Sequence, residues 1–501
     1  MRGVTRAGFL ALLASCGPEA EGGPVPADAA TDAAGLDAAA AGDGVNAPPE
    51  RRADLEPGPF LPLTADGQAI LDAAGRQVIL RGLEHHALQD VDYVGREVGP
   101  EDYARIASWG FTMLRLAISW SRIEPERGRY DDEYVAQIAD ALDRAEGAGL
   151  AALVEWHQDL WGRCSQADDS TFRVNANGAP DWTCPDDYVP SLLGHWELFD
   201  RLWANEDGLG DAFLDAWQVV IDSVGEHPAL LGYDVINEPQ GSGGSPAFER
   251  DRLFPALGAI VPDLRARGAR GLLVLDAPAL RNETFEMWVE PLGHLGPDLV
   301  FAPHLYSGWM RMYLARERVP PEDKAADFAA AEEQAAGLGL ALWNGEWGVN
   351  LSLNGAIADL ETHVASEDAA RIGSSYWAFQ RAVPGQGDDS ISGGQSLLDE
   401  DGDVRQDVLD RLSRPYPIQS PGRLSRVAFD FETARLDVEL DAETTIDAPL
   451  VLYAPARILG PRSCLTVDGP GDWSWDELRE RELVLVGLAA EGRWSIRLER
   501  C

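Results

Sequence analysis

The sequence predicts an α/β fold, a (β/α)8 TIM barrel followed by a C-terminal antiparallel β-sandwich. Two patterns predict it. Eight short apolar, β-prone runs alternate with helical stretches from about Val78 to Phe379, and after Pro417 short strands with a period of two replace this alternation. A chain of 501 residues is long enough to bury a large core and to form a second domain.

The apolar runs indicate parallel strands, because strands that are buried on both faces are almost continuously apolar. A doubly wound open sheet is the alternative, but no GxGxxG motif follows the first run, which disfavours it. The runs begin at Val78, Thr112, Ala151, Leu230, Gly271, Asp298, Leu340 and Gly373.

Amphipathic stretches between these runs predict the helices of the barrel. Asp131–Ala148 and Gly210–His227 each place apolar side chains on one face at i, i+3 and i+4 spacing, so we expect these faces to pack on the strands. The two faces consist of Tyr134, Val135, Ile138, Ala141, Leu142 and Ala145, and of Phe213, Trp217, Val220, Ile221 and Val224.

Residues 59–416 are the predicted barrel and residues 417–501 the predicted sandwich. Val427–Leu440 alternates apolar and polar side chains, and the runs LVLYAPA, CLTVDG, LVLVGL and RWSIRLERC follow, separated by Gly, Pro and Asp turns. No helix of useful length is expected between them. Short alternating strands at this spacing are typical of an antiparallel sandwich.

Residues 1–16 are interpreted as an export signal. An apolar run that is too short to span a bilayer follows Arg2 and Arg6, and it closes with Leu13-Ala14-Ser15-Cys16. This ending resembles the lipobox of bacterial lipoproteins, which implies a lipidated Cys16 and a bacterial outer-membrane or cell-surface lipoprotein; secretion through an ordinary signal peptide is the alternative. Residues 17–58 are rich in Ala, Gly, Asp and Pro and predict a flexible tether.

The charge excludes some classes of partner. With 84 acidic and 41 basic residues the net charge is −43, so we expect neither nucleic acid nor electrostatic docking on anionic lipid. No CxxC pair or His/Cys cluster predicts zinc, and we expect no metal or cofactor. An exported protein meets an oxidising compartment, and local pairing, which we favour among three connectivities, joins Cys164 to Cys184 and Cys464 to Cys501.

Polar residues recur at the carboxyl ends of the predicted strands, the end that forms the active-site face of a (β/α)8 barrel. Glu238 follows the fourth strand and Glu346 the seventh, so they face each other across the barrel. Glycoside hydrolysis with retention needs two carboxyl groups roughly 5–5.5 Å apart, one protonated and one ionised. The full set is Arg115, His157, Asp159, Asn237, Glu238, His304, Tyr306, Glu346 and Trp377.

The neighbours of the two glutamates suit this chemistry. Asn237 can hydrogen-bond a sugar 2-hydroxyl, and Trp377 offers a flat face for a sugar ring. Tyr306 can orient Glu346. Arg115 can keep Glu346 ionised by charge attraction, which leaves Glu238 to carry the proton.

In this order the residues resemble glycoside hydrolase family 5, whose members are retaining barrel enzymes. Finer motifs resemble its endoglycoceramidase branch, which cuts the bond between glycan and ceramide in glycosphingolipids: EWHQDLW from Glu155, GAPDW from Gly178, FDRLWANEDGLGDAFLDAWQVV from Phe199, GYDVINEP from Gly232, and RPYP at Arg414–Pro417. The resemblance implies that Glu238 is the acid/base and Glu346 the nucleophile. It also implies that the first sugar contacts His157, Asp159, Asn237, Tyr306 and Trp377.

Two loops depart from that branch, GLEHHALQDVDY after the first strand and SGWMRMY after Tyr306, and they leave the substrate open. The alternatives are a family 5 hydrolase of β-linked polysaccharide or of steryl glucosides, and a non-catalytic glycan-binding surface lipoprotein. A lipid aglycone needs an apolar groove. Its candidate lining is Trp309, Met310, Met312, Tyr313 and Leu314, with Trp156, Trp161 and Trp182, and ordinary core packing is the alternative for all of them.

Overall fold

The structure is a computed structural model that describes residues 37–40, 50–85, 88, 98–166, 177–191, 194–381 and 394–501. Residues Gly35–Cys501 form one compact unit. Cys16, the rest of the predicted export signal and most of the predicted tether lie outside the described residues. Within the tether, β1 (Asp37–Ala40) and β2 (Glu50–Arg51) are described, and they pair with strands β19 and β20 of the C-terminal region.

The predicted parallel barrel is present, and its seventh strand is in two parts. β12 pairs with β11, and β13 pairs with β14, so residues 341–347 close the ring. Between them, the Trp343 N–H donates to the Phe301 carbonyl at 3.0 Å. The strands are β6 (Gly82–His85), β7 (Met113–Ile118), β8 (Ala151–Trp156), β9 (Leu230–Asp234), β10 (Leu272–Asp276), β11 (Leu299–Ala302), β12 (Ala341–Leu342), β13 (Asn344–Trp347) and β14 (Ser374–Tyr376).

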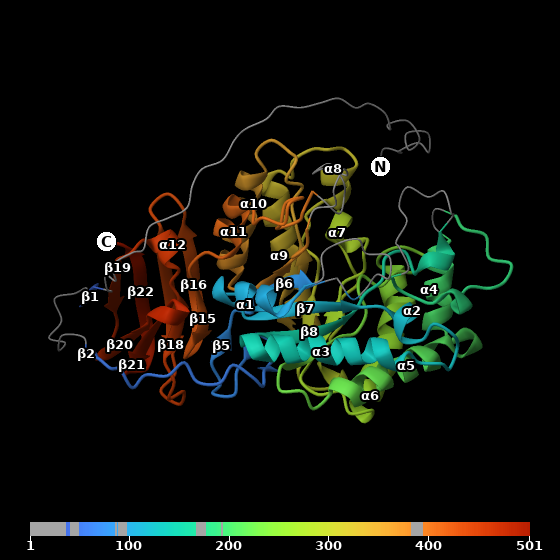
Figure 1. Cartoon of the computed structure of the whole chain (residues 1–501), viewed down its shortest axis with the longest axis horizontal. Helices are drawn as coiled ribbons and strands as arrows, with labels where there is room; N and C mark the ends of the chain where they lie inside the picture. The colour runs from blue at the N-terminus through green and yellow to red at the C-terminus, as the bar shows by residue number, and fades with distance from the viewer. Residues whose placement is uncertain are drawn as a thin grey trace. The chain divides into compact units, whose positions relative to one another are not determined.

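The predicted amphipathic helices cover the barrel. Helix α3 (Asp132–Ala148) begins after Asp131, whose carboxylate caps the N–H groups of Glu133 and Tyr134, and ends at Gly149 in the left-handed conformation. In Figure 1, α3 runs along the outside of β7 and β8. All the side chains of its predicted face and of the face of α5 (Leu209–Val224) are buried. Further helices are α1 (Pro100–Ser108), α2 (Trp120–Ile123), α4 (His195–Trp203), α6 (Phe254–Ala266), α7 (Arg281–Thr284), α8 (Trp309–Tyr313), α9 (Pro321–Leu338), α10 (Ala356–Ala370) and α11 (Gln406–Leu412).

The C-terminal region folds as two sheets that share one apolar core. Its strands pair with one another antiparallel, as predicted, and the helices described among them are short: the single turn α12 (Ala456–Leu459) and a 3-10 turn at Arg479–Arg481. The strands are β15 (Tyr416–Ser420), β16 (Gly422–Asp430), β17 (Arg435–Ala442), β18 (Leu450–Tyr453), β19 (Ser463–Asp468), β20 (Trp473–Leu478), β21 (Leu483–Leu488) and β22 (Gly492–Arg500).

The segment before the barrel belongs to the C-terminal sheets, and this corrects the predicted start of the first barrel strand. Strands β3 (Thr64–Ala65), β4 (Ile70–Leu71) and β5 (Gln77–Val78) extend the sheet that contains β15, and β5 pairs with β15. Val78 therefore lies outside the barrel, whose first strand begins at Gly82. Sequence periodicity alone does not separate the two segments, because both are apolar and follow each other without a turn.

A buried ion-pair network joins segments that are distant in sequence, and two disulfides join nearer ones. Asp368 on α10 accepts from Arg81 at 2.6 Å and from two nitrogens of Arg414 at 2.6 and 3.1 Å, and all three side chains are buried. Both locally paired disulfides form, Cys164–Cys184 and Cys464–Cys501.

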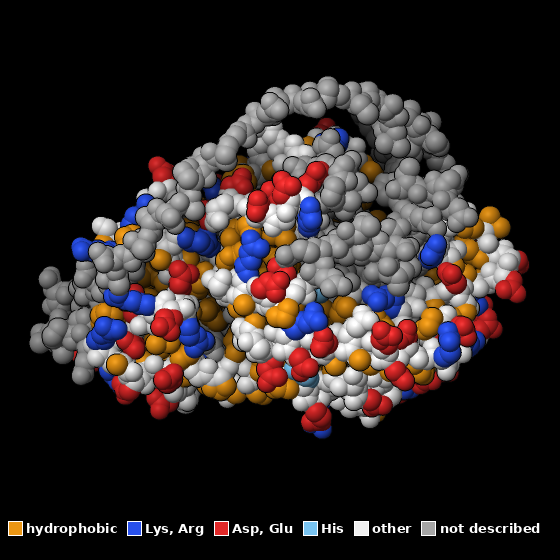
Figure 2. All heavy atoms as spheres, in the orientation of Figure 1, with side chains coloured by type: hydrophobic (Ala, Val, Ile, Leu, Met, Phe, Trp, Pro, Cys, Tyr) orange, Lys and Arg blue, Asp and Glu red, His pale blue; other side chains and the backbone are white. Residues whose placement is uncertain are grey.

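Two further features are the distribution of charge on the surface and the apolar character of the helices. Acidic and basic side chains are interspersed over the face in Figure 2 rather than separated into large patches. Among the described residues, no helix combines the length and the apolar character that a membrane crossing requires.

Candidate active site

Arg115 is the centre of the polar cluster at the carboxyl ends of the barrel strands. It lies within β7, its side chain is fully buried, and its position among parallel strands lets it reach residues within or just after five other strands. Its guanidinium donates to Asp234 Oδ2 (2.9 Å), Asn237 Oδ1 (3.0 Å), Glu346 Oε2 (3.1 Å), Glu84 Oε2 (3.2 Å) and Asp276 Oδ2 (3.3 Å), and it also lies 3.5 Å from Glu155 Oε1.

This cluster holds more carboxylates than one guanidinium can neutralise. Burial, together with neighbouring carboxylates and against the attraction of Arg115, raises the pKa of Glu84 and that of Asp234 well above their ordinary values. Glu84 Oε1 and Asp234 Oδ1 have no hydrogen-bond partner among the described residues. Both observations fit carboxyl groups that hold protons beneath the site, where an unpaired buried charge would be costly.

Glu346 lies at the end of β13 and is held through both carboxylate oxygens. The Tyr306 hydroxyl donates to Oε1 at 2.6 Å, and Arg115 donates to Oε2 at 3.1 Å. Burial raises the pKa of Glu346 in spite of the opposing charges of His304 and Arg115. Arg115 thus contacts Glu346 as the sequence predicts, but its attraction does not outweigh the desolvation of the carboxylate.

Glu238 follows β9 in a backbone conformation that is unusual for a residue other than glycine, with φ of +40°. Side chains hold this turn: the Gln158 amide donates to the Asn237 and Glu238 carbonyls at 2.8 and 3.1 Å, and the Glu238 N–H donates to Asp276 Oδ2 at 3.2 Å. The turn lets the consecutive side chains of Asn237 and Glu238 both enter the site.

The Glu238 carboxylate receives two donors at one oxygen. Asn282 Nδ2 lies 2.6 Å and His304 Nδ1 2.9 Å from Oε1. Burial opposes protonation of His304, but the carboxylates of Asp276 and Glu346 raise its pKa well above the ordinary value, which favours the cationic imidazole. Glu238 is also the more open of the two glutamates, with 21% of its side chain exposed against 9% for Glu346.

His304 lies between the two glutamates. Its Nδ1 is 2.9 Å from Glu238 Oε1 and 3.9 Å from Glu346 Oε1. The two oxygens are therefore closer together than the sum of these distances, which is compatible with the roughly 5–5.5 Å separation of a retaining pair. The structure brings the two predicted carboxylates together across the barrel.

His157, Asp159 and Trp377 form one wall of the site. His157 Nε2 lies 3.3 Å from Asp159 Oδ2, and the Asn177 amide donates to the same oxygen at 2.9 Å. The His157 and Trp377 rings are stacked with their centroids 5.4 Å apart. All nine predicted strand-end residues therefore lie in or beside this cluster. A separate hollow beside α3, lined by Arg122 and Tyr134 among others, contains none of them.

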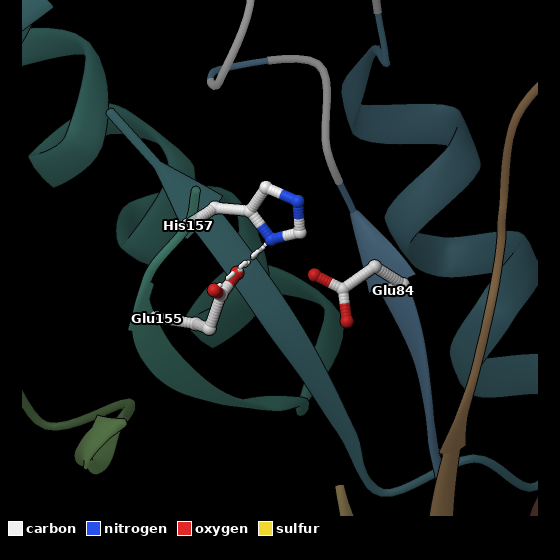
Figure 3. A group of neighbouring side chains, drawn as sticks. All are labelled: Glu84, Glu155 and His157. Atoms are coloured by element: carbon white, nitrogen blue, oxygen red, sulfur yellow. Dashed lines mark hydrogen bonds and ion pairs between the residues drawn. The ribbon is translucent and has the colours of Figure 1, made fainter. Parts of the chain in front are cut away.

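Glu84, Glu155 and His157 are placed closely enough to resemble a metal site, with one ligand atom of each lying within 4.8 Å of the others (Figure 3). However, His157 Nδ1 lies 3.0 Å from Glu155 Oε1, and the guanidinium of Arg115 contacts both carboxylates. Arg115 and His157 therefore already occupy these carboxylates, and the group supports the site. That no metal or cofactor takes part stays a prediction.

Several residues of the cluster were not identified from the sequence. All but Asn282 share one signal, a polar residue within or just after an apolar strand, which is costly to bury without a partner. Asn282 lacks this signal, because it lies on the short helix α7 beyond β10 and reaches Glu238 only through the tertiary fold. The residues are Glu84, Glu155, Gln158, Asp234, Asp276 and Asn282.

Comparisons with known proteins agree with this geometry. The family model described as "Cellulase (glycosyl hydrolase family 5)" matches residues 71–382. Endoglycoceramidase I of Rhodococcus hoagii (strain 103S) is 25% identical over 419 residues, which cover 74% of this chain and 75% of that protein. An endoglycoceramidase of Hydra vulgaris is 24% identical over 213 residues, or 36% of this chain and 41% of that one.

Solved structures share the fold over almost the whole described chain. Endo-glycoceramidase II from Rhodococcus sp., solved as a ganglioside GM3 complex, has a TM-score of 0.71 at 22% identity and covers 87% of this chain and 99% of that chain. Sterylglucosidase 1 of Cryptococcus neoformans has a TM-score of 0.69 at 13% identity, over 90% and 99% of the two chains. The barrel and the C-terminal sheets therefore recur together in these proteins.

Proposed function

Because this chain belongs to glycosyl hydrolase family 5, we propose that it is a retaining endo-β-glycosidase that cleaves the bond between glycan and ceramide in glycosphingolipids. The chain is a glycoside hydrolase, and its similarity to endoglycoceramidases directs the choice of substrate. One observation carries the proposal: two differently held carboxylates lie beside exposed apolar side chains on the acid/base side of the barrel.

The reaction is a double displacement. Glu346 attacks the anomeric carbon while Glu238 donates a proton to the departing oxygen, and the glycosyl–Glu346 ester forms as the bond to the aglycone breaks. Glu238 then removes a proton from water, which attacks the ester and releases the glycan. Tyr306 and Arg115 hold the Glu346 carboxylate for the first step. Asn237, whose amide is fixed against Arg115 and Gln158, is placed to contact the sugar 2-hydroxyl.

The apolar side chains lie on two short helices, which we call the α7–α8 lip (residues 280–284 and 309–314). Leu280, Met310 and Leu314 are 37%, 40% and 45% exposed. The lip is next to the acid/base because Asn282 belongs to α7 and contacts Glu238. Since the acid/base protonates the leaving group, exposed apolar surface here favours an apolar aglycone.

The prediction of the aglycone groove is wrong for several of the side chains that were expected to line it. Trp156 and Trp161 are 2% exposed and pack around Trp120 in the barrel core, where Trp182 meets the same ring edge-on. Met312 and Tyr313 are buried as well. Aromatic composition does not distinguish a groove from a core, and here the core explanation holds for these side chains.

Product analysis on a substrate panel tests the proposal. The panel contains glycosphingolipids with glucose or galactose next to ceramide, steryl glucosides, and β-glucans. We expect intact oligosaccharide and ceramide from a glycosphingolipid, with the β-anomer formed first. Release of sterol alone would make steryl glucosides the substrate, and release of reducing ends from β-glucan alone would make the substrate a polysaccharide. Wild-type protein that binds glycans without cleaving any of them would support the glycan-binding alternative.

Replacing Tyr306 by Phe is expected to move the acid limb of kcat/KM to higher pH. The nucleophile must be ionised, so activity falls as the pH drops through the pKa of Glu346, which burial already raises. Loss of the Tyr306 O–H donor disfavours the carboxylate further. The measurement is kcat/KM against pH. Tyr376→Phe is the control, because the one hydrogen bond described for its hydroxyl goes to the Gln395 carbonyl. If the acid limb of Tyr306→Phe stays where it is in wild type, the Tyr306 hydroxyl does not stabilise the Glu346 carboxylate.

We also propose that the protein is a lipoprotein anchored through Cys16. The support is the apolar run that ends in Leu13-Ala14-Ser15-Cys16. Expression in a bacterial host of the full chain and of Cys16→Ser, followed by detergent phase partitioning, tests it. Wild type is expected in the detergent phase and Cys16→Ser in the aqueous phase, because several acyl chains anchor firmly while none remain on serine. Equal partitioning of the two proteins would refute the anchor.

A further inference from the structure

Asn282 is a buried side chain that contacts the acid/base and no other part of the site. Its Nδ2 donates to Glu238 Oε1 at 2.6 Å, and it is 5% exposed. Its Oδ1 has no partner among the described residues, so the amide's one described hydrogen bond is the bond to Glu238. A buried amide with a single short hydrogen bond to a carboxylate indicates a position that is set for that carboxylate.

The backbone fixes where this amide lies. The Asn282 N–H donates to the Ala279 carbonyl at 3.1 Å, and the Asn282 carbonyl accepts from the Gly308 N–H at 3.1 Å. The preceding residue, Arg281, is fully buried and bonds Asp327 and Gln334 of α9. Asn282 is therefore held from α9 and from the loop that carries α8, and not by Glu238 itself.

We propose that Asn282 is the positioning residue of the acid/base: it holds Oε1 of Glu238 so that Oε2 carries the proton to the departing oxygen. His304 donates to the same Oε1, so both donors described at the carboxylate act on one oxygen. With Oε1 occupied, Oε2 is the oxygen left to bear the transferable proton. The inference rests on the proposed assignment of Glu238 as acid/base.

Loss of Asn282 is expected to affect fewer carboxylates than loss of His304. His304 also lies 3.1 Å from Asp276 and 3.9 Å from Glu346, so its replacement disturbs both glutamates. Among the described residues, the Asn282 side chain hydrogen-bonds Glu238 alone. Its loss should therefore weaken only the proton transfer to the leaving group, and the effect should depend on how much help the leaving group needs.

Leaving-group dependence tests this role. For Asn282→Ala and the nearly isosteric Asn282→Leu, kcat/KM is measured on two β-glycosides of the same sugar, one with an alkyl alcohol and one with dinitrophenol as leaving group. We expect a loss of about 10- to 100-fold on the alkyl glycoside, which corresponds to one hydrogen bond to a charged group, and less than about threefold on the dinitrophenyl glycoside. Thr362→Ala, on α10 and away from the site, is the control and should match wild type on both, because its hydroxyl donates to the Ala358 carbonyl of its own helix.

The outcomes separate the two claims. Equal losses on both substrates, with normal thermal melting, would show a general effect and overturn the positioning role. Full activity of Asn282→Leu on the alkyl glycoside would also overturn it, because this variant keeps the volume but cannot donate. Glu238→Ala with an undiminished rate on the alkyl glycoside would instead overturn the assignment of the acid/base. If a variant fails to fold, Asn282→Ser supplies a smaller donor at the same position and should fall between wild type and Asn282→Ala.

Discussion

Glu346→Gln is expected to lower kcat/KM by on the order of 10⁴-fold or more, because the carboxylate is the attacking group and no other carboxylate described in the site can replace it at the anomeric carbon. The amide keeps the size of the side chain, so Tyr306 and Arg115 can still pack against it. The measurement is hydrolysis of an activated aryl glycoside, for which protonation of the leaving group is unimportant. Wild-type turnover by this variant would remove Glu346 from the mechanism.

The same residue can be tested by trapping. A 2-fluoro glycoside with an activated leaving group slows the second displacement, so wild-type protein should gain the mass of one fluoroglycosyl group on the peptide that contains Glu346. Glu346→Gln should gain none. Glu332→Gln is the matched control, since it makes the same chemical change on α9 at an exposed residue paired with Arg371. It should label and turn over like wild type.

Asp368→Ala is expected to reduce the free energy of unfolding by about 3–5 kcal/mol, the range for breaking a buried ion pair by removing one partner. Asp368 is the carboxylate shared by Arg81 and Arg414, and its loss leaves two guanidinium groups facing each other out of contact with water. The two guanidinium groups already disfavour each other's charge in the intact protein, where burial and the charge of Arg414 lower the pKa of Arg81 to about 10.

Urea unfolding followed by tryptophan fluorescence measures this loss, provided that refolding is reversible. Asp140→Ala is the control, because its partner Arg144 is one turn away on α3 and both side chains are exposed; such pairs contribute about 0–1 kcal/mol. A loss of stability in Asp368→Ala no larger than in Asp140→Ala would show that the buried network is dispensable.

The catalytic face could be predicted from the sequence because of where its residues stand. Glu238 and Glu346 each follow an apolar strand, and parallel strands bring their carboxyl ends to one edge of a barrel. The argument needs only the order of strands and not their packing. The local disulfide Cys164–Cys184 followed in the same way from short sequence separation.

The rest depended on tertiary contacts that periodicity does not contain. In the sequence, Asp276 only closes the apolar run that begins at Gly271, yet in the structure it contacts Arg115, His304 and the Glu238 N–H. Trp156 was a candidate for the aglycone groove with core packing as the alternative, because a large aromatic residue at the end of a strand suits either environment. The support of Glu346 was predicted correctly, whereas the rise of its pKa follows from burial, which no spacing argument measures.

The pairing of β5 with β15 has a consequence for protein engineering. Residues 64–78 precede the barrel, yet they lie in the same sheet as residues 416–420, and Gln419 even donates to the Asp72 carboxylate at 2.7 Å across 347 residues of sequence. The two regions are therefore not modules that can be exchanged at a single cut near residue 416. A chimera that receives a foreign sandwich must receive its partner for β5 as well, so a workable transplant carries the N-terminal strands together with the C-terminal ones and treats the barrel as an insertion between them.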